Sequence, residues 1–143
     1  MWLRCETFKM PPSINSKIGV EGSDMCAILI IDDEKGIREI IQEILTLFGH
    51  SVDTASDGRE GIQKFDDNSF DLVITDVRMP GVSGNTVVEH IRNSRKKSTP
   101  VIGMSGTPWL LNNQDFDMVL QKPFPLQTLI ESVKRLPQLA AGT

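Results

Sequence analysis

Apolar and polar residues alternate along the chain in two patterns: short continuous apolar runs and longer stretches with helical spacing. The first apolar run, AILIID, begins at Ala27. The next stretch places Ile37, Ile41 and Phe48 at helical spacing, and Gly49 then supplies a helix stop. This pair of patterns repeats to the end of the chain. The remaining predicted strands are SVDTA, FDLVIT, PVIGMS and DMVLQ, and the remaining predicted helices are GREGIQKFDD, GNTVVEHIRNSR and PLQTLIESVKRL.

The regular alternation of strands with helices predicts an α/β fold. Such units form right-handed crossovers and a parallel sheet that helices cover on both faces. The five predicted strands are nearly continuous apolar runs, which suit buried parallel strands better than an antiparallel sheet with one wet face. We therefore predict a doubly wound, five-stranded parallel sheet.

Residues 1–24 show neither pattern. This segment mixes two adjacent prolines with serine, glycine and scattered charge, a composition typical of a tail. The whole chain of 143 residues suits one compact domain with a real core. We therefore predict an N-terminal tail over 1–24, one folded domain over 25–137, and a C-terminal tail over 138–143.

Composition narrows the function further. A net charge of −4 disfavours nucleic-acid binding, which needs a basic surface to neutralise phosphates. No apolar run approaches the roughly 18 residues needed to span a bilayer, and Met1–Met10 lack the apolar core of a secretory leader. Cys5 and Cys26 lack CxxC spacing, and we expect both thiols to be reduced. We expect a cytoplasmic protein that binds neither nucleic acid nor membrane.

Polar residues follow the predicted strands. Asp32 and Asp33 follow the first strand and Asp76 the third, while Ser105 and Lys122 come after the fourth and fifth. Taken singly, each has an ordinary role as a helix cap, a turn residue or a solvated cation. In an open parallel sheet, however, all five converge on the edge that carries the ligand site. Three carboxylates placed together repel one another unless a cation offsets them, and their hard oxygens suit Mg²⁺.

This set of residues can support phosphoryl transfer. A carboxylate beside Mg²⁺ and a lysine can attack phosphorus in line, because the metal and the ammonium neutralise charge that spreads over the equatorial oxygens. Asp76 is the candidate nucleophile. No GxGxxG follows the first strand and no GxxxxGK[ST] occurs anywhere, so the sequence lacks the glycine loops of dinucleotide and nucleoside-triphosphate sites.

Four motifs in order resemble bacterial response-regulator receiver domains over about residues 25–137. They are AILIIDDEKGIRE, DLVITDVRMPGVSG, the pair Ser105-Gly106, and QKPF. The spacing fits as well, with 43 positions from Asp33 to Asp76 and 29 from Asp76 to Ser105. The resemblance implies a flavodoxin-like fold whose five strands are ordered 2-1-3-4-5.

The resemblance also implies a metal site. Asp33 and Asp76 would bind Mg²⁺ directly, Asp32 would support the metal shell, and the backbone carbonyl of Arg78 would be a further ligand. Gly84 would be the flexible point before the next helix.

For the phosphoryl group, the resemblance implies that Asp76 is the acceptor. The hydroxyl of Ser105 would bind one phosphoryl oxygen, and Lys122 would hold another as a compact cation. The Lys122-Pro123 bond is expected to be cis, which only an X-Pro bond adopts at low cost.

Function follows from the resemblance as an expectation. The domain would take a phosphoryl group from a partner histidine kinase or phosphotransfer protein and signal to a downstream protein that the sequence does not identify. It would be a switch more than an enzyme, with self-catalysed transfer and slow hydrolysis. Two alternatives stay open: a degenerate receiver that only binds proteins, and a phosphatase of the haloacid-dehalogenase type. The latter class carries DxDxT on its first strand, whereas this strand ends in Asp32-Asp33-Glu34.

Two departures from the family pattern concern the end of the domain. Receivers usually carry an aromatic switch residue three positions before the lysine, and here that position is Val119. Only 17 positions lead from Ser105 to Lys122, so we predict a short or irregular fourth helix around 107–113. We expect the apolar residues 109–111 to fold down over the sheet, because large apolar residues are mostly buried. The alternative is an exposed contact site.

Overall fold

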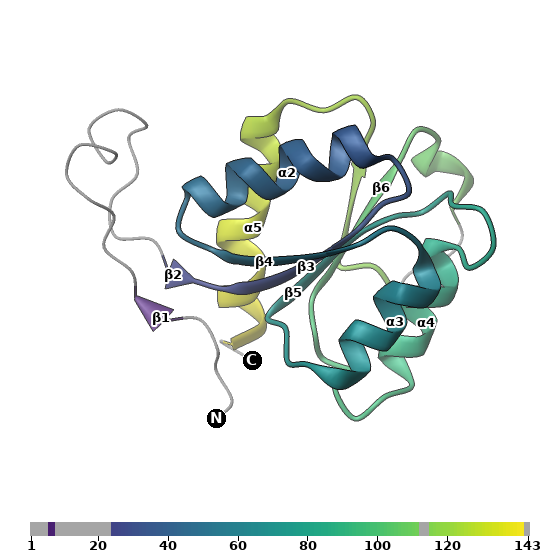
Figure 1. Cartoon of the computed structure of the whole chain (residues 1–143), viewed down its shortest axis with the longest axis horizontal. Coiled ribbons are helices and arrows are strands. Elements are labelled where there is room, and N and C mark those ends of the chain that lie inside the picture. Colours follow the sequence, from purple (N-terminus) through teal and green to yellow (C-terminus); the bar gives the residue numbers. More distant parts are fainter. Residues whose placement is uncertain (1–5, 8–23, 112–114, 142–143) are drawn as a thin grey trace.

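A parallel sheet forms the centre of the molecule, in a computed structural model that describes residues 6–7, 24–111 and 115–141 (Figure 1). Its strand order is β4-β3-β5-β6-β7, which is 2-1-3-4-5 along the sheet-forming part of the chain, and every neighbouring pair is parallel. The predicted doubly wound, flavodoxin-like fold is therefore confirmed. The strands are β3 (Ala27–Ile31), β4 (Ser51–Ala55), β5 (Leu72–Asp76), β6 (Val101–Ser105) and β7 (Met118–Gln121).

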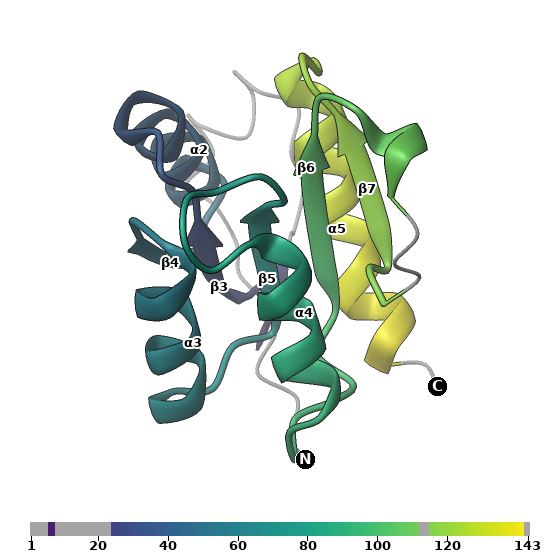
Figure 2. The same cartoon turned by 90° about the vertical axis from the view of Figure 1, so that its right-hand side faces the viewer.

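Helices cover both faces of the sheet, as Figures 1 and 2 show. On one face α2 (Lys35–Leu47) and α5 (Leu126–Ala141) pack over β3, β5 and β6. On the other face lie α3 (Gly58–Asp67) and α4 (Gly84–Arg92). Successive strand residues point to opposite faces, so each central strand contributes to two separate apolar cores. The side chains of β3 show this division: Ile28 and Ile30 join the first core, Leu29 and Ile31 the second.

Local sequence signals define the ends of the helices. The side chain of Asp57 caps α3 by accepting the backbone N–H of Glu60, and Ser83 caps α4 by accepting that of Thr86. After α2 the chain reverses at Gly49, whose φ of 95° suits glycine. The predicted helix stop at this position is confirmed.

The crossover from β6 to β7 differs from the others. In its described residues it contains a single 3₁₀ turn, η1 (Pro108–Leu110), which confirms the predicted short fourth helix there; positions 112 and 113 of that prediction lie outside the described residues. Trp109 is 68% exposed and Leu110 63% exposed, so the expectation that they fold down over the sheet is wrong. Instead the ring of Phe116 covers the sheet, lying 3.0 Å from where a Cβ on Gly103 would stand. Leu111 alone of residues 109–111 packs partly against this core.

The N-terminal part contains more structure than the predicted tail. β1 (Glu6–Thr7) pairs antiparallel with β2 (Asp24–Met25), so the range 1–24 contributes residues to a short two-stranded sheet. Cys26 is disulfide-bonded, and the expectation of a reduced thiol at that position is wrong; Cys5 lies outside the described residues. The spacing of cysteines in a sequence does not reveal which of them the fold brings within bonding distance. None of the helices in the described part of the chain combines the length and apolarity needed to cross a bilayer.

Candidate phosphoacceptor site

Three carboxylates meet at the carboxyl edge of the sheet. Asp32 and Asp33 follow β3, and Asp76 is the last residue of the neighbouring strand β5. One carboxylate oxygen from each lies within 4.8 Å of the others. Asp32 is fully buried and Asp76 is 5% exposed, whereas Asp33 is open to solvent. The sequence-based prediction that these residues converge is confirmed.

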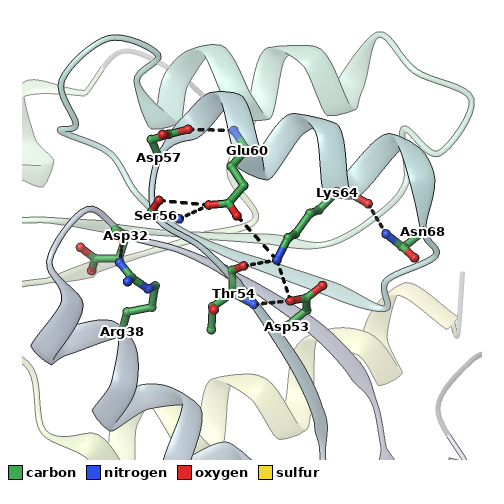
Figure 3. A network of polar contacts seen from close by, with 9 residues as sticks. All are labelled: Asp32, Arg38, Asp53, Thr54, Ser56, Asp57, Glu60, Lys64 and Asn68. Atoms are coloured by element: carbon green, nitrogen blue, oxygen red, sulfur yellow. Dashed lines mark hydrogen bonds and ion pairs between the residues drawn. The ribbon is translucent and has the colours of Figure 1, made fainter.

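Hydrogen bonds hold Asp32 on several sides. Its backbone N–H donates to the carbonyl of Ala55 on β4 at 3.1 Å, and its Oδ1 accepts the backbone N–H of Glu34 at 2.9 Å. Its own carbonyl accepts Nη1 of Arg38 at 2.7 Å, and Figure 3 shows Arg38 beside it. The other carboxylate oxygen, Oδ2, is buried and has no hydrogen-bond partner among the described residues. A buried carboxylate oxygen in this state is suited to a cation or to a water bound by one.

Burial alters the acidity of both inner carboxyl groups. It raises the pKa of Asp32 to about 6, and the negative charge of Asp76 adds to this, while the N–H of Glu34 and the charge of Lys122 act in the opposite direction. Burial also raises the pKa of Asp76, against the opposing effect of Lys122. Placing these carboxylates side by side therefore has an electrostatic cost that a bound cation would relieve.

Lys122 completes the charged part of the site. Its Nζ lies 3.2 Å from Oδ1 of Asp76. The backbone N–H of Lys122 donates to the carbonyl of Ser105 at 2.8 Å, which ties the end of β7 to the end of β6. The Lys122-Pro123 peptide is cis, as expected.

Ser105 lies at the same edge of the sheet, but the structure shows no hydrogen bond from it to the carboxylates. It stands one position beyond Met104, which pairs with Asp76 across β5 and β6. Its side chain is buried, and its Oγ accepts the backbone N–H of Thr107 at 3.0 Å. Because that bond occupies a lone pair, the hydroxyl proton remains free to donate to a ligand.

The loop after β5 is shaped by close packing. A Cβ on Gly84 would lie 2.3 Å from the carbonyl oxygen of Asp76 and 2.7 Å from Cα of Val77. The backbone N–H of Gly84 also donates to the carbonyl of Val77 at 2.9 Å. Gly84 is therefore needed for close approach of the backbone, and its predicted flexibility stays a prediction. Arg78, in the same loop, is exposed.

Two residues near the site were not identified from the sequence. Arg38 lies one turn into α2, where a long side chain points back toward the acids that precede the helix, and this position was the available signal. Phe116 lies before β7 and had no comparable signal, because its contact with Gly103 on β6 joins positions that are distant in the sequence. Val119, at the position of the missing aromatic residue, is half-buried and packs against the same core as Phe116.

The donor set fits a small hard cation. Three carboxylates provide hard oxygen ligands, one of them exposed so that a hydrated ion can approach, and one buried oxygen has no other partner in the described part of the chain. Mg²⁺ keeps several waters and uses few carboxylates, which suits an open edge of this kind. Asp32, Asp33 and Asp76 are the residues that would hold it.

Comparison with known proteins identifies relatives of this site and fold. A family model described as the response regulator receiver domain matches residues 28–134. The chain is 38% identical over 114 residues to response regulator RR06 of Streptococcus pneumoniae, covering 76% of this chain and 52% of that protein. It is 35% identical over 116 residues to a probable transcriptional regulator, ycf27, of Cyanidium caldarium, covering 76% of this chain and 46% of that protein. The chain thus spans about half the length of these relatives.

Among solved structures, the chain is similar to the response regulator protein TrrA of Thermotoga maritima, in complex with Mg²⁺ and BeF. The match has a TM-score of 0.72 and 38% sequence identity, and it covers 78% of this chain and 99% of that one.

Proposed function

The chain belongs to the response regulator receiver domain family of two-component signalling, and from this premise we propose that it accepts a phosphoryl group on Asp76 in a Mg²⁺-dependent reaction. The observation that carries the proposal is the 3.2 Å contact between Nζ of Lys122 and Oδ1 of Asp76, beside two further carboxylates. An acceptor, a cation and a metal-binding set are what transfer to a carboxylate requires. The Mg²⁺ in the complex of TrrA supports the choice of metal.

The residues divide the work as follows. An oxygen of Asp76 attacks phosphorus, the new P–O bond forms as the bond to the donor's leaving group breaks, and the leaving group departs with the bonding electrons. Lys122, which contacts the carboxylate of unphosphorylated Asp76, would contact an oxygen of the transferred phosphoryl group. The hydroxyl of Ser105 would donate a hydrogen bond to another oxygen of that group. When bound, Mg²⁺ would supply charge neutralisation at this site. Asp33, Asp76 and the carbonyl of Arg78 would hold it directly, and Asp32 would hold it through its hydration shell.

We further propose that the product is a signal and not a released compound. The domain, over residues 25–137 between tails at 1–24 and 138–143, would catalyse its own phosphorylation and lose the group slowly by hydrolysis. The chain spans about half the length of the relatives that it matches, so the partners of those whole proteins cannot be assigned to it directly. We propose that a downstream protein receives the signal, without identifying that protein.

A histidine kinase or a phosphotransfer protein would be the donor, and a groove beside the site supports this choice. The groove has a volume of about 430 Å³ and is lined in part by Lys122, whose Nζ lies 3.2 Å from Oδ1 of Asp76, so a protein seated there would lie beside the acceptor. Its wall includes the exposed side chains of Ile37, Ile40 and Leu126, which offer apolar contact area to such a donor.

The proposed donor supports a cytoplasmic location for this domain. Kinases that autophosphorylate on histidine use ATP, so they phosphorylate their partners in the compartment that supplies ATP. The disulfide at Cys26 opposes this placement, since cytosolic thiols are kept reduced. Counting free thiols in freshly purified, denatured protein decides between the two: two free thiols support the cytoplasm, and none supports an oxidising compartment.

Intact-mass measurement after incubation with Mg²⁺ and phosphoramidate tests the proposed chemistry. Wild type should gain one phosphoryl group only when Mg²⁺ is present, and Asp76→Asn should gain none. Asp67→Asn, which changes an exposed carboxylate at the far end of α3, is the matched control and should behave as wild type.

Other outcomes select the alternatives. A wild type without any adduct indicates a degenerate receiver that only binds proteins. Continuous release of phosphate from esters without an adduct indicates a hydrolase. An adduct that persists in Asp76→Asn places the acceptor at another residue and overturns the assignment.

A further inference from the structure

Arg38 makes a contact whose purpose the proposed chemistry does not explain. It lies in the second turn of α2, where its backbone N–H donates to the carbonyl of Glu34 at 3.0 Å. Side chains on a helix point back toward its N-terminus, and that of Arg38 reaches Asp32, six positions earlier. Its Nη1 donates to the backbone carbonyl of Asp32 at 2.7 Å (Figure 3). The side chain is half-buried, so this hydrogen bond is partly shielded from water.

The accepting carbonyl belongs to the peptide that joins Asp32 to Asp33. A peptide unit is planar, so fixing its oxygen also fixes the direction in which the next residue leaves. The N–H of Asp32 is already tied to Ala55, and its Oδ1 to Glu34. The bond from Arg38 adds control over the orientation of Asp33, whose carboxylate is exposed to solvent.

Arg38 reaches the site through the backbone: its Nη1 donates to the carbonyl oxygen of Asp32, which belongs to the peptide that carries Asp33. The bond therefore acts on Asp33 through the peptide plane.

We infer that Arg38 is a positioning residue, which holds the Asp32-Asp33 peptide so that the carboxylate of Asp33 faces Asp76 across the cation site. This inference deepens the proposed function and depends on a divalent cation binding between these carboxylates. Residues that orient metal ligands from behind typically change metal affinity by about 10- to 100-fold when they are lost.

Mg²⁺ titration by calorimetry, on the unphosphorylated full chain, tests the inference. Arg38→Met keeps the length of the side chain but removes its donors, and it should weaken Mg²⁺ binding by about 10-fold. Arg38→Lys keeps a donor and should recover part of that loss. Arg59→Met, at an exposed arginine in the first turn of α3, is the matched control and should bind Mg²⁺ as wild type does.

A second readout separates positioning from simple damage to the fold. The melting temperature without Mg²⁺ should differ little between wild type and Arg38→Lys, while Mg²⁺ affinity should follow the order wild type, Arg38→Lys, Arg38→Met. In a double-mutant cycle with Asp33→Asn, the loss caused by Arg38→Met should shrink, because the carboxylate that it orients is gone.

Equal Mg²⁺ affinity in wild type and Arg38→Met overturns the inference, as does full additivity with Asp33→Asn. A wild type that binds Mg²⁺ but takes up no phosphoryl group leaves the inference standing while the proposed function fails. A wild type that binds no Mg²⁺ overturns both.

Discussion

The segments that follow Asp76 and Ser105 leave the same edge of the sheet from adjacent strands, yet they are built in opposite ways. After Asp76, Val77 and Met79 are buried, and Gly84 lies against the carbonyl of Asp76. After Ser105, a Cβ on Gly106 would meet nothing within 4 Å, and the chain continues into a single 3₁₀ turn with exposed apolar side chains. The first segment packs several of its residues against the core, although Arg78 is exposed, and the second segment leaves the sheet into open space.

This difference separates the placement of the acceptor from the surface beside it. The backbone at Asp76 is held by packing that leaves no room for a methyl group, so its position is determined by the core. The segment after Ser105 is connected to the site by the hydrogen bond from Thr107 to the Ser105 hydroxyl. Its exposed side chains, such as Trp109 and Leu110, can therefore change without disturbing the acidic residues.

Replacing one glycine by alanine in each segment should test most directly whether the two segments differ in packing. Gly84→Ala is expected to destabilise the fold by roughly 3 kcal/mol, because the new Cβ overlaps backbone atoms of Asp76 and Val77, which would have to shift. Gly106→Ala should change stability by less than about 0.5 kcal/mol. Urea denaturation of both variants measures the two effects, and similar values would show that the segments do not differ in packing.

Truncating one aromatic side chain at a time sharpens the comparison within the open segment. Phe116→Ala should cost roughly 3 to 4 kcal/mol, because a buried ring that packs over Gly103 is removed and a cavity remains. Trp109→Ala should cost less than about 0.5 kcal/mol, since its side chain is largely exposed. The same denaturation assay applies. A large loss in Trp109→Ala would mean that η1 packs against the domain in solution.

The buried part of the acidic site should also give a pH dependence of stability, through Asp32. Its folded-state pKa of about 6 is raised from an ordinary value of 3.8, so folding takes up a proton between these values and stability falls as pH rises through this window. Asp32→Asn removes the cost of ionising this buried carboxyl group. Without Mg²⁺, the variant should be more stable than wild type by roughly 2 to 3 kcal/mol at about pH 7.5. The difference should shrink as the pH is lowered toward about 4.

Denaturation of both proteins across this pH range, with a chelator present, measures the effect. Asp67→Asn serves as the exposed control. A constant difference between Asp32→Asn and wild type would indicate that the substitution acts through packing and not through the charge of the carboxylate.

Most of the fold was predictable because its signals are local. Buried parallel strands are apolar over their whole length, and the helices between them show helical periodicity with capping residues at Asp57 and Ser83. The convergence of Asp32, Asp33, Asp76 and Lys122 followed from the rule that parallel strands end at one edge. The pairing of β1 with β2 had no such signal, because strands of two residues show no periodicity.

The sequence by itself determined which segments form the strands, the residues at their ends and the shortness of the β6-β7 crossover, and the order of the strands came from the resemblance to receiver domains. Only the tertiary structure decided which side chains pack against one another. Phe116 covers Gly103 and leaves Trp109 exposed, Gly84 is required for close approach, and Arg38 reaches the carbonyl of Asp32. Hydrophobic periodicity indicates which face of a helix or strand points to the core. The contacts of Phe116, Gly84 and Arg38 depend instead on the distances between elements that meet only after the chain has folded.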